Sequence, residues 1–259
     1  MDKVIDIQIW QMISAYIFIL VLLAIVKIRG INREKQIVIS AFRMTIQLIL
    51  TGYILVYVFD NPSPVYTILI IILMEIFAIY NIYKRVKLTL SKKLKKIIAI
   101  SMTIGTLTSL FFFVFIVIHI SPWYDPRYFI PIAGMLIGNS MTGISLGVTR
   151  LVDGMQSQKN LVETALMLGA TPKSASKEIV DNAFDSAILP TINSMIGMGI
   201  VFLPGMMTGQ ILSGISPITA IEYQIAIMLG ILGSVSLTVI LFVQLGYKTF
   251  FNEEDQLTI

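Results

Sequence analysis

The sequence predicts an all-α integral membrane protein with about seven transmembrane helices and one short helical region outside the membrane. The first observation is composition: 56% of the 259 residues are hydrophobic and 13% are charged, whereas soluble domains have about 25% charged residues. The second is that the apolar residues gather in stretches of about 20, the length that crosses a bilayer as a helix. The third is that the basic residues fall in alternating loops.

The spans are separated by short polar turns. The segment 60–64 contains two prolines, and the segment 121–126 carries Trp123 and Tyr124, residue types that favour the membrane interface. We see no internal repeat and expect a single membrane domain over 1–259. The expected spans are roughly 10–28, 37–59, 65–83, 97–120, 129–149, 187–208 and 221–247.

The basic residues predict the orientation of the chain. Most of the 19 Lys and Arg lie in the loops after the first, third, fifth and seventh spans, and the opposite loops contain Lys3 and Arg127. The positive-inside rule then places the N-terminus outside and the C-terminus in the cytosol of a multi-pass cell-membrane protein. We attribute the net charge of +4 to this topology rather than to nucleic-acid binding, and expect the basic loop 84–96 to contact anionic lipid.

The segment 150–187 interrupts the apolar pattern and predicts a cytosolic region of two helices. The first is expected over 157–168 and to stop at Gly169. Thr171 is placed to cap the second helix, with Pro172 at its first position. Pro190 should kink this second helix where it enters the membrane. Its acidic residues at spacings of three and four are either a solvated face or a cation-gathering mouth: Glu178, Asp181 and Asp185.

Two further segments are unusual for membrane helices. The span 129–149 carries glycines four residues apart, which let helices approach closely, either within one chain or at a dimer or pore-lining face: Gly134, Gly138, Gly143 and Gly147. The apolar segment 203–217 contains several Gly and Pro residues, which disfavours one continuous helix. We expect a broken or re-entrant element there.

Composition also excludes several kinds of site. The chain has no Cys and one His, so a thiolate site and a multi-His metal centre in one chain are excluded. It has no Walker A motif. No Ser-His pair or clustered acid and base indicates an enzyme, and we assign no catalytic residue.

Three blocks resemble one family of transport proteins: PIAGMLIGNSM (131–141), LGATPKSAS (168–176) and LPGMMTGQILSGISP (203–217). They are similar to the FetB-type ABC permeases, seven-span proteins associated with metal export and with relatives in plant aluminium tolerance. The resemblance extends from Arg43 and Gln47 to the segment 222–224. It implies a homodimer with two copies of a separate ABC ATPase subunit, which would hold ATP and Mg²⁺, while this chain binds no cofactor.

The spacing E-x-A-x-x-x-G from Glu163 to Gly169 resembles the coupling helix that docks ABC permeases onto the ATPase. One departure concerns Asp181 and Asn182, which replace the Leu-Pro of the importer signature, so the detailed importer geometry does not transfer. The predicted ATPase-coupling residues are Leu161, Glu163, Ala165, Leu166, Gly169 and Ala170.

Polar and thioether residues within the spans are candidates for a translocation pathway. Each has an alternative role: Arg43 could reach the interface, Glu75 could pair with a basic group such as Arg43, and most of the 14 Met must serve packing. The metal-binding residues stay open. The candidates are Arg43, Gln47, Glu75, Asn139, Asn193, Met206, Met207 and Gln210.

The sequence therefore favours a permease subunit for ATP-driven export of iron or another metal. The iron assignment comes from the resemblance alone. The alternatives are an ABC permease for a different solute and a membrane channel that works without nucleotide.

The first testable prediction concerns topology. Because the chain has no Cys, single cysteines can be labelled without background. We expect Ser63→Cys to react with an impermeant thiol reagent in intact cells, and Ser91→Cys to react only after the cells are opened. The reverse pattern would overturn the predicted orientation.

Overall fold

The computed structural model describes residues 7–86 and 90–258, which leaves the predicted loop residues Lys3 and Lys87 outside the described residues. The described chain is helical, which confirms the all-α part of the predicted fold class. It divides into two compact units that we describe separately: the part before Pro62 together with Leu212–Gly214, and the remainder from Pro62 onward. Among the described residues, six helical segments are long and apolar enough to cross a membrane: Ile9–Ile28, Glu34–Asp60, Pro64–Arg85, Lys92–Ile118, Pro126–Ser157 and Pro217–Phe250.

The first unit contains three helices: α1 (Ile9–Ala15), α2 (Ile17–Ile28) and α3 (Glu34–Asp60). Tyr16 joins α1 to α2, and its hydroxyl hydrogen-bonds with the Thr45 hydroxyl of α3. Gly30 turns the chain between α2 and α3 with a φ of +66°, a conformation that a side chain disfavours. Most apolar side chains of this unit are exposed, as expected of helices that face lipid.

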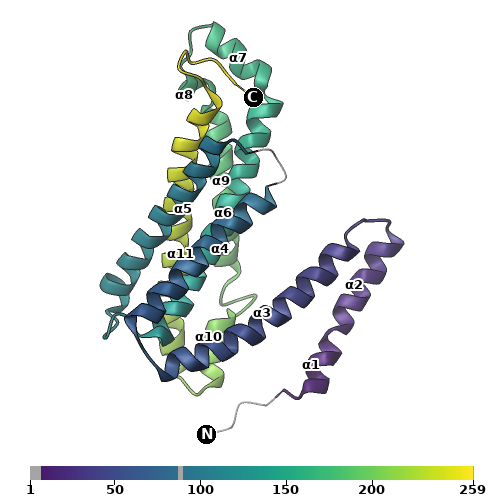
Figure 1. Ribbon diagram of the computed structural model, residues 1–259, viewed down its shortest axis with the longest axis vertical. Helices are drawn as coiled ribbons and strands as arrows, with labels where there is room; N and C mark the ends of the chain where they lie inside the picture. Colours follow the sequence, from purple (N-terminus) through teal and green to yellow (C-terminus); the bar gives the residue numbers. More distant parts are fainter. Residues whose placement is uncertain (1–6, 87–89, 259) are drawn as a thin grey trace. The chain divides into compact units, whose positions relative to one another are not determined.

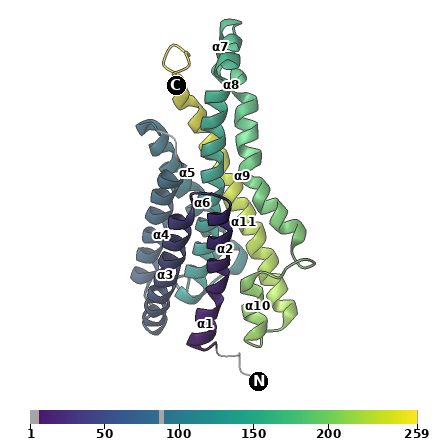
Figure 2. The same ribbon diagram turned by 90° about the vertical axis from the view of Figure 1, so that its right-hand side faces the viewer.

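The second unit is built on five long helices that run side by side (Figure 1, Figure 2). Short helices lie at its two ends: α7 (Lys159–Met167) and α8 (Pro172–Ala175) at the end where the last long helix finishes, and α10 (Gly205–Leu212) at the other. The long helices are α4 (Pro64–Arg85), α5 (Lys92–Phe112, continued by the π-helix Phe113–Ile118), α6 (Pro126–Ser157), α9 (Lys177–Gly197) and α11 (Pro217–Gly246, continued by the 3-10 turn Tyr247–Phe250).

Local chemistry explains where several of these helices begin. Ser63 accepts a hydrogen bond from the Val65 amide at the start of α4, and Ser91 accepts one from the Leu94 amide at the start of α5. Asp125 does the same for α6 through the Arg127 amide. Each cap satisfies an amide that has no partner within its helix.

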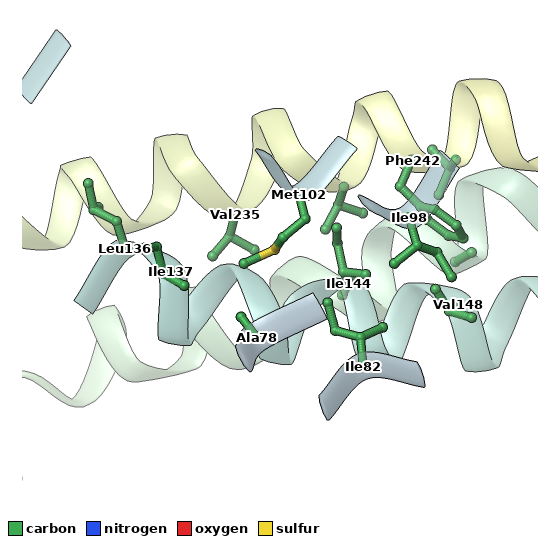
Figure 3. Close-up of a cluster of buried hydrophobic side chains, with 14 of the residues drawn as sticks. Ala78, Ile82, Ile98, Met102, Leu136, Ile137, Ile144, Val148, Val235 and Phe242 are labelled. Carbon is green, nitrogen blue, oxygen red and sulfur yellow. The ribbon is translucent and has the colours of Figure 1, made fainter. Parts of the chain in front are cut away.

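The core of the second unit lies where α4, α5, α6 and α11 meet (Figure 3). Its largest side chains are fully buried and aliphatic or aromatic, with Phe242 of α11 against Ile98 of α5 and Val148 of α6 at one end. Glycine brings the helices together: a Cβ on Gly143 of α6 would lie 2.7 Å from Val235 Cγ1 of α11. For Gly143 and Gly147, packing within one chain is therefore confirmed.

One expected span is wrong as a continuous helix. We predicted a helix over 187–208, but α9 ends at Gly197 and α10 starts at Gly205. Gly199 takes a φ of +85°, and its amide donates to the Phe202 carbonyl 3.0 Å away, which closes a turn. The first half of α9 carries charged residues, so α9 lacks the apolar length of a single span. Pro190 lies inside α9, and the helix bends in its lower half (Figure 2), as predicted.

The boundaries in the 150–187 region also differ from the prediction. α6 continues eight residues past the expected end of its span, to Ser157. Polar residues such as Arg150 and Asp153 end the apolar span, but they can still form helix. The expected helix 157–168 is α7, Lys159–Met167. Gly169 ends it with a φ of +89°, and Thr171 caps Pro172–Ala175, as predicted. The second helix is interrupted at Ser176 and continues as α9.

Gly105 of α5 provides a test of this packing. A Cβ there would lie 2.7 Å from Thr238 Cα of α11, where backbone rather than a flexible side chain must move. We expect Gly105→Ala to destabilise the protein by about 1–3 kcal/mol, seen as a lower melting temperature in detergent. Gly233→Ala on α11 is the control, because its Cβ would meet nothing within 4 Å. Equal melting temperatures for the two variants would contradict this helix contact.

Candidate functional site

A cavity of about 300 Å³ lies between α6, α9, α11 and the segment that joins α9 to α10. Its lining combines four thioethers, two carboxamides and three hydroxyls with apolar groups, and the described residues that line it include no charged side chain. The polar and thioether members are Met135, Asn139, Thr142, Thr191, Ser194, Met198, Met206, Gln224 and Met228.

Helical spacing explains why pairs of these side chains face the same cavity. Met135 and Asn139 are one turn apart on α6, and Gln224 and Met228 are one turn apart on α11, so each pair shares a helix face. Met198 follows directly after α9. The Gln224 amide Nε2 lies 3.7 Å from the Met198 sulfur and donates to it. The interruption of α9 thus turns a thioether toward α11 inside the cavity.

Non-helical backbone in a membrane protein needs internal hydrogen bonds or a water-filled cavity. The segment 198–204 has internal hydrogen bonds and borders the cavity. The Val201 amide donates to the Gly197 carbonyl at 2.9 Å, and Met198, Phe202 and Pro204 line the cavity. The break is therefore part of the site rather than a defect in a span.

A polar face continues from this cavity along α6 and α9. On α6 it includes the exposed residues Asn139, Thr142, Arg150 and Asp153, and the exposed apolar side chain Leu146 lies between Thr142 and Arg150 on the same face. Towards α7 it reaches a second cavity, of about 320 Å³. Exposed polar groups on membrane helices are costly in lipid and face water or protein instead. The second cavity is lined by Arg150, Asp153, Gly154, Ser157, Gln158, Ile179, Asn182, Asp185 and Ser186.

Glu75 lies elsewhere, in the contact between α4 and α5. Its side chain is buried, with 6% of the residue exposed, and one carboxylate oxygen accepts a hydrogen bond from the Thr106 hydroxyl at 3.1 Å. The other oxygen has no hydrogen-bond partner among the described residues. The donor shown is a hydroxyl, and pairing of Glu75 with a basic group such as Arg43 stays a prediction.

The cavity brings together two of the predicted pathway residues, Asn139 and Met206. The others are not among its lining residues, and the roles of all eight stay predictions. Arg43 and Gln47 are exposed on α3 in the first unit. The remaining residues are Glu75 in the α4–α5 contact, Asn193 exposed on α9, Met207 buried in α10 and Gln210 half-buried in α10.

Sequence reasoning missed most of the cavity lining. Met135, Met198, Gln224 and Met228 were not singled out, because 14 Met in an apolar chain give little contrast. A signal was present: Met135 with Asn139, and Gln224 with Met228, are thioether and carboxamide pairs four residues apart. Within the described ranges, no group of three or more His, Asp or Glu could hold a metal ion.

The predicted coupling segment is a separate short helix with two kinds of surface. Val162 is buried, Ala165 and Leu166 are half-buried, and Lys159 pairs with Glu163 at 3.8 Å. Three apolar side chains face outward: Leu161 is 62% exposed, and Met167 and Leu168 are each 85% exposed. Gly169 and Ala170 close the helix through amides that donate to the carbonyls of Leu166 and Ala165.

Comparison of the sequence with known proteins identifies the family of this chain. The model of the uncharacterised protein family UPF0014 matches residues 9–251. The chain belongs to the UPF0014 family of membrane proteins. The match covers both units and includes the cavity, the polar face and α7.

Several known proteins are similar to this chain along most of its length. The UPF0014 membrane protein YjkA of Bacillus subtilis is 36% identical over 93% of this chain and 94% of its own. The "Probable iron export permease protein FetB" of Escherichia coli is 35% identical over 87% and 85%. The "Protein ALUMINUM SENSITIVE 3" of Arabidopsis thaliana is 34% identical over 92% and 86%. No solved structure matches.

The hydrogen bond to Glu75 gives a third prediction. Thr106→Val keeps the shape of the side chain but removes its hydroxyl. The buried carboxyl group of Glu75 then loses the hydrogen bond that this hydroxyl donates. We expect a loss of about 1–3 kcal/mol in stability, measured by thermal unfolding in detergent. Thr108→Val, at an exposed position of the same helix, is the control. If both variants melt alike, Thr106 does not support Glu75.

Proposed function

We propose that this chain is the permease subunit of an ABC transporter that exports iron or another metal across the cell membrane. The observation that carries the proposal is α7, a short helix that exposes Leu161, Met167 and Leu168 at one end of the helical unit. The sequence contains no Walker A motif, so the proposed ATPase is a separate subunit with its own ATP and Mg²⁺.

The surface of α7 suits a soluble protein partner better than lipid. Its exposed apolar side chains stand beside the polar group Glu163, which is half-exposed and ion-paired with Lys159. An apolar centre with a polar rim is the usual composition of a protein interface. We propose that the ATPase subunit covers this face, with Leu161, Glu163, Ala165, Leu166, Gly169 and Ala170 forming or shaping the coupling element.

The connection between α7 and the cavity supports a mechanical role. A single residue, Gln158, separates the end of α6 from the start of α7. α6 in turn lines the cavity with Met135 and Asn139. A displacement of α7 on ATP binding would therefore move α6 directly, and would open or close the cavity by rigid-body rocking of the helices.

We propose that α9 and α10 together make the seventh crossing, with the break at 198–204 inside the membrane. Both helices belong to one single permease domain over 1–259 in this proposal. The exposed polar groups of α6 and α9 need cover from water or protein. A second copy of the chain supplies this cover, so that two permeases and two ATPase subunits enclose the pathway.

The choice of metal rests on the relatives. The name of the Escherichia coli relative refers to iron export, and the name of the Arabidopsis thaliana relative refers to aluminium sensitivity. We therefore propose a transport subunit without catalytic residues, with its N-terminus outside and its C-terminus in the cytosol. A permease for a different solute would use the same α7 and the same polar face, so it remains the second candidate.

Charge reversal on α7 gives the fourth prediction. We expect Glu163→Lys to weaken binding of the ATPase subunit, because it replaces the partner of Lys159 with a second positive charge. Gly169→Val should act similarly, since its φ of +89° strains a β-branched residue. The measurement is co-purification of the ATPase subunit with the permease from membranes, together with ATP-dependent metal flux in inside-out vesicles.

The matched control is Glu254→Lys, the same reversal at an exposed carboxylate outside α7. It should retain the ATPase subunit and the flux. If both α7 variants keep normal complex formation and normal flux, α7 is not the coupling element. Flux of an unrelated solute with none for iron or other metals would remove the metal from the proposal.

A further inference from the structure

The cavity between α6, α9 and α11 has a donor set that points to one class of cation. We infer that it binds a soft monovalent ion, of the kind represented by Cu(I) and Ag(I), through its four methionine sulfurs. The inference rests on the proposed transport function and deepens it, because it assigns a cation class to the cavity. The four residues are Met135, Met198, Met206 and Met228.

Four separate segments supply the sulfurs. Met135 comes from α6, Met198 from the break after α9, Met206 from the first turn of α10, and Met228 from α11. Met155 of α6, by contrast, is fully buried in the hydrophobic core. The four sulfurs line a cavity together with carboxamides and hydroxyls, so they border a space that a ligand can enter.

The chemical type of the donors selects the ion. Thioethers are soft ligands that favour Cu(I), whereas carboxylates and water suit hard ions. The described lining of this cavity has no carboxylate, and the chain has no Cys and a single His. A hard trivalent ion would find no preferred ligand among these side chains.

The charge of the ion is a second, independent argument for a monovalent cation. Moving an ion out of water costs a free energy that grows with the square of its charge, so a trivalent ion pays about nine times the cost of a monovalent one of equal size. The described lining has no negative charge to offset this cost. A singly charged ion is therefore the one that a neutral lining can hold and release.

The contact of Met198 with Gln224 places one of the four sulfurs beside a polar group of the lining. The Met198 sulfur already accepts a weak hydrogen bond from Gln224 Nε2 at 3.7 Å, so it offers a lone pair to a polar group in the cavity. A cation that replaces this N–H would take the same lone pair. Methionine has three rotatable bonds, so each of the four sulfurs can turn within the cavity that its residue lines.

The test is binding of Ag(I), a redox-stable substitute for Cu(I), to the purified full-length permease in detergent and chloride-free buffer. We expect titration calorimetry to show one tight Ag(I) per chain. A variant with all four cavity methionines changed to Leu should bind at least tenfold more weakly. Met→Leu conserves volume in a packed site, and the melting temperature of the variant verifies that it folds.

Two controls address the other methionines. Met155→Leu removes a sulfur from the hydrophobic core on α6, and Met102→Leu removes one from the core on α5, and neither residue lines the cavity. Both should bind Ag(I) like the unchanged protein. Equal binding by the four-fold variant and the unchanged protein, or an equal loss in the controls, would overturn the inference.

The binding assay needs no ATPase subunit, so a negative result would contradict the soft-cation site without contradicting the proposed transport function. Absent Ag(I) binding with intact ATP-dependent flux of another ion would remove the soft-cation site and leave the transporter. Tight Ag(I) binding that the four-fold variant loses would support the site even if no ATPase subunit associates with α7.

Discussion

The close approach of α6 to α9 and α11 is the constraint on which the rest of the second unit depends. It is possible because Gly143 and Gly147 have no side chain: a Cβ on Gly143 would collide with Val235 and lie 3.5 Å from the Ala187 carbonyl. Small residues on α9, Ala183 and Ala187, are buried at the same contact. The three helices are thereby fixed at the distance that lets one set of side chains from each line a shared cavity.

The interruption of α9 gives this packing its function in our account. A continuous helix would have placed Met198 on a regular helical face, whereas the turn at Gly199 directs it toward Gln224 of α11. The backbone of the break is hydrogen-bonded within itself and borders the cavity. A membrane helix can be broken at low cost only in such a place, so the break and the cavity explain each other.

Local signals in the sequence predicted local structure well. Gly169, Thr171 and Pro172 act as stop, cap and first residue because each is a preference of one or two residues and depends little on the surroundings. Hydropathy predicted the positions of most spans because it, too, depends on the local sequence. It failed at the end of α6, where Arg150 and Asp153 were counted as loop although helix formation does not require apolar residues. It failed again at 187–208, where a run of apolar residues concealed the turn at Gly199.

The site was predicted less completely, because a cavity joins residues that are distant in sequence. Asn139 and Met206 were found as polar or thioether residues within spans, but nothing in the sequence connected them with Met228 across the bundle. Glu75 attracted attention as a charge in a span, and its Thr106 donor lies on another helix. A candidate residue can be recognised from its type, whereas its contact partners depend on which helices pack together.

The central claim is that the exposed polar face of α6 lines a water-filled passage, and thiol accessibility tests it most directly. In a chain without native cysteines, Asn139→Cys and Thr142→Cys lie on this face, and Ile104→Cys lies at an exposed apolar position of α5. The measurement is the reaction rate of each thiol with a charged, membrane-impermeant thiosulfonate in membranes that expose both sides. The account predicts fast reaction at 139 and 142 and slow reaction at 104. Equally slow reaction at all three positions would mean that lipid or packed protein, and not water, covers this face.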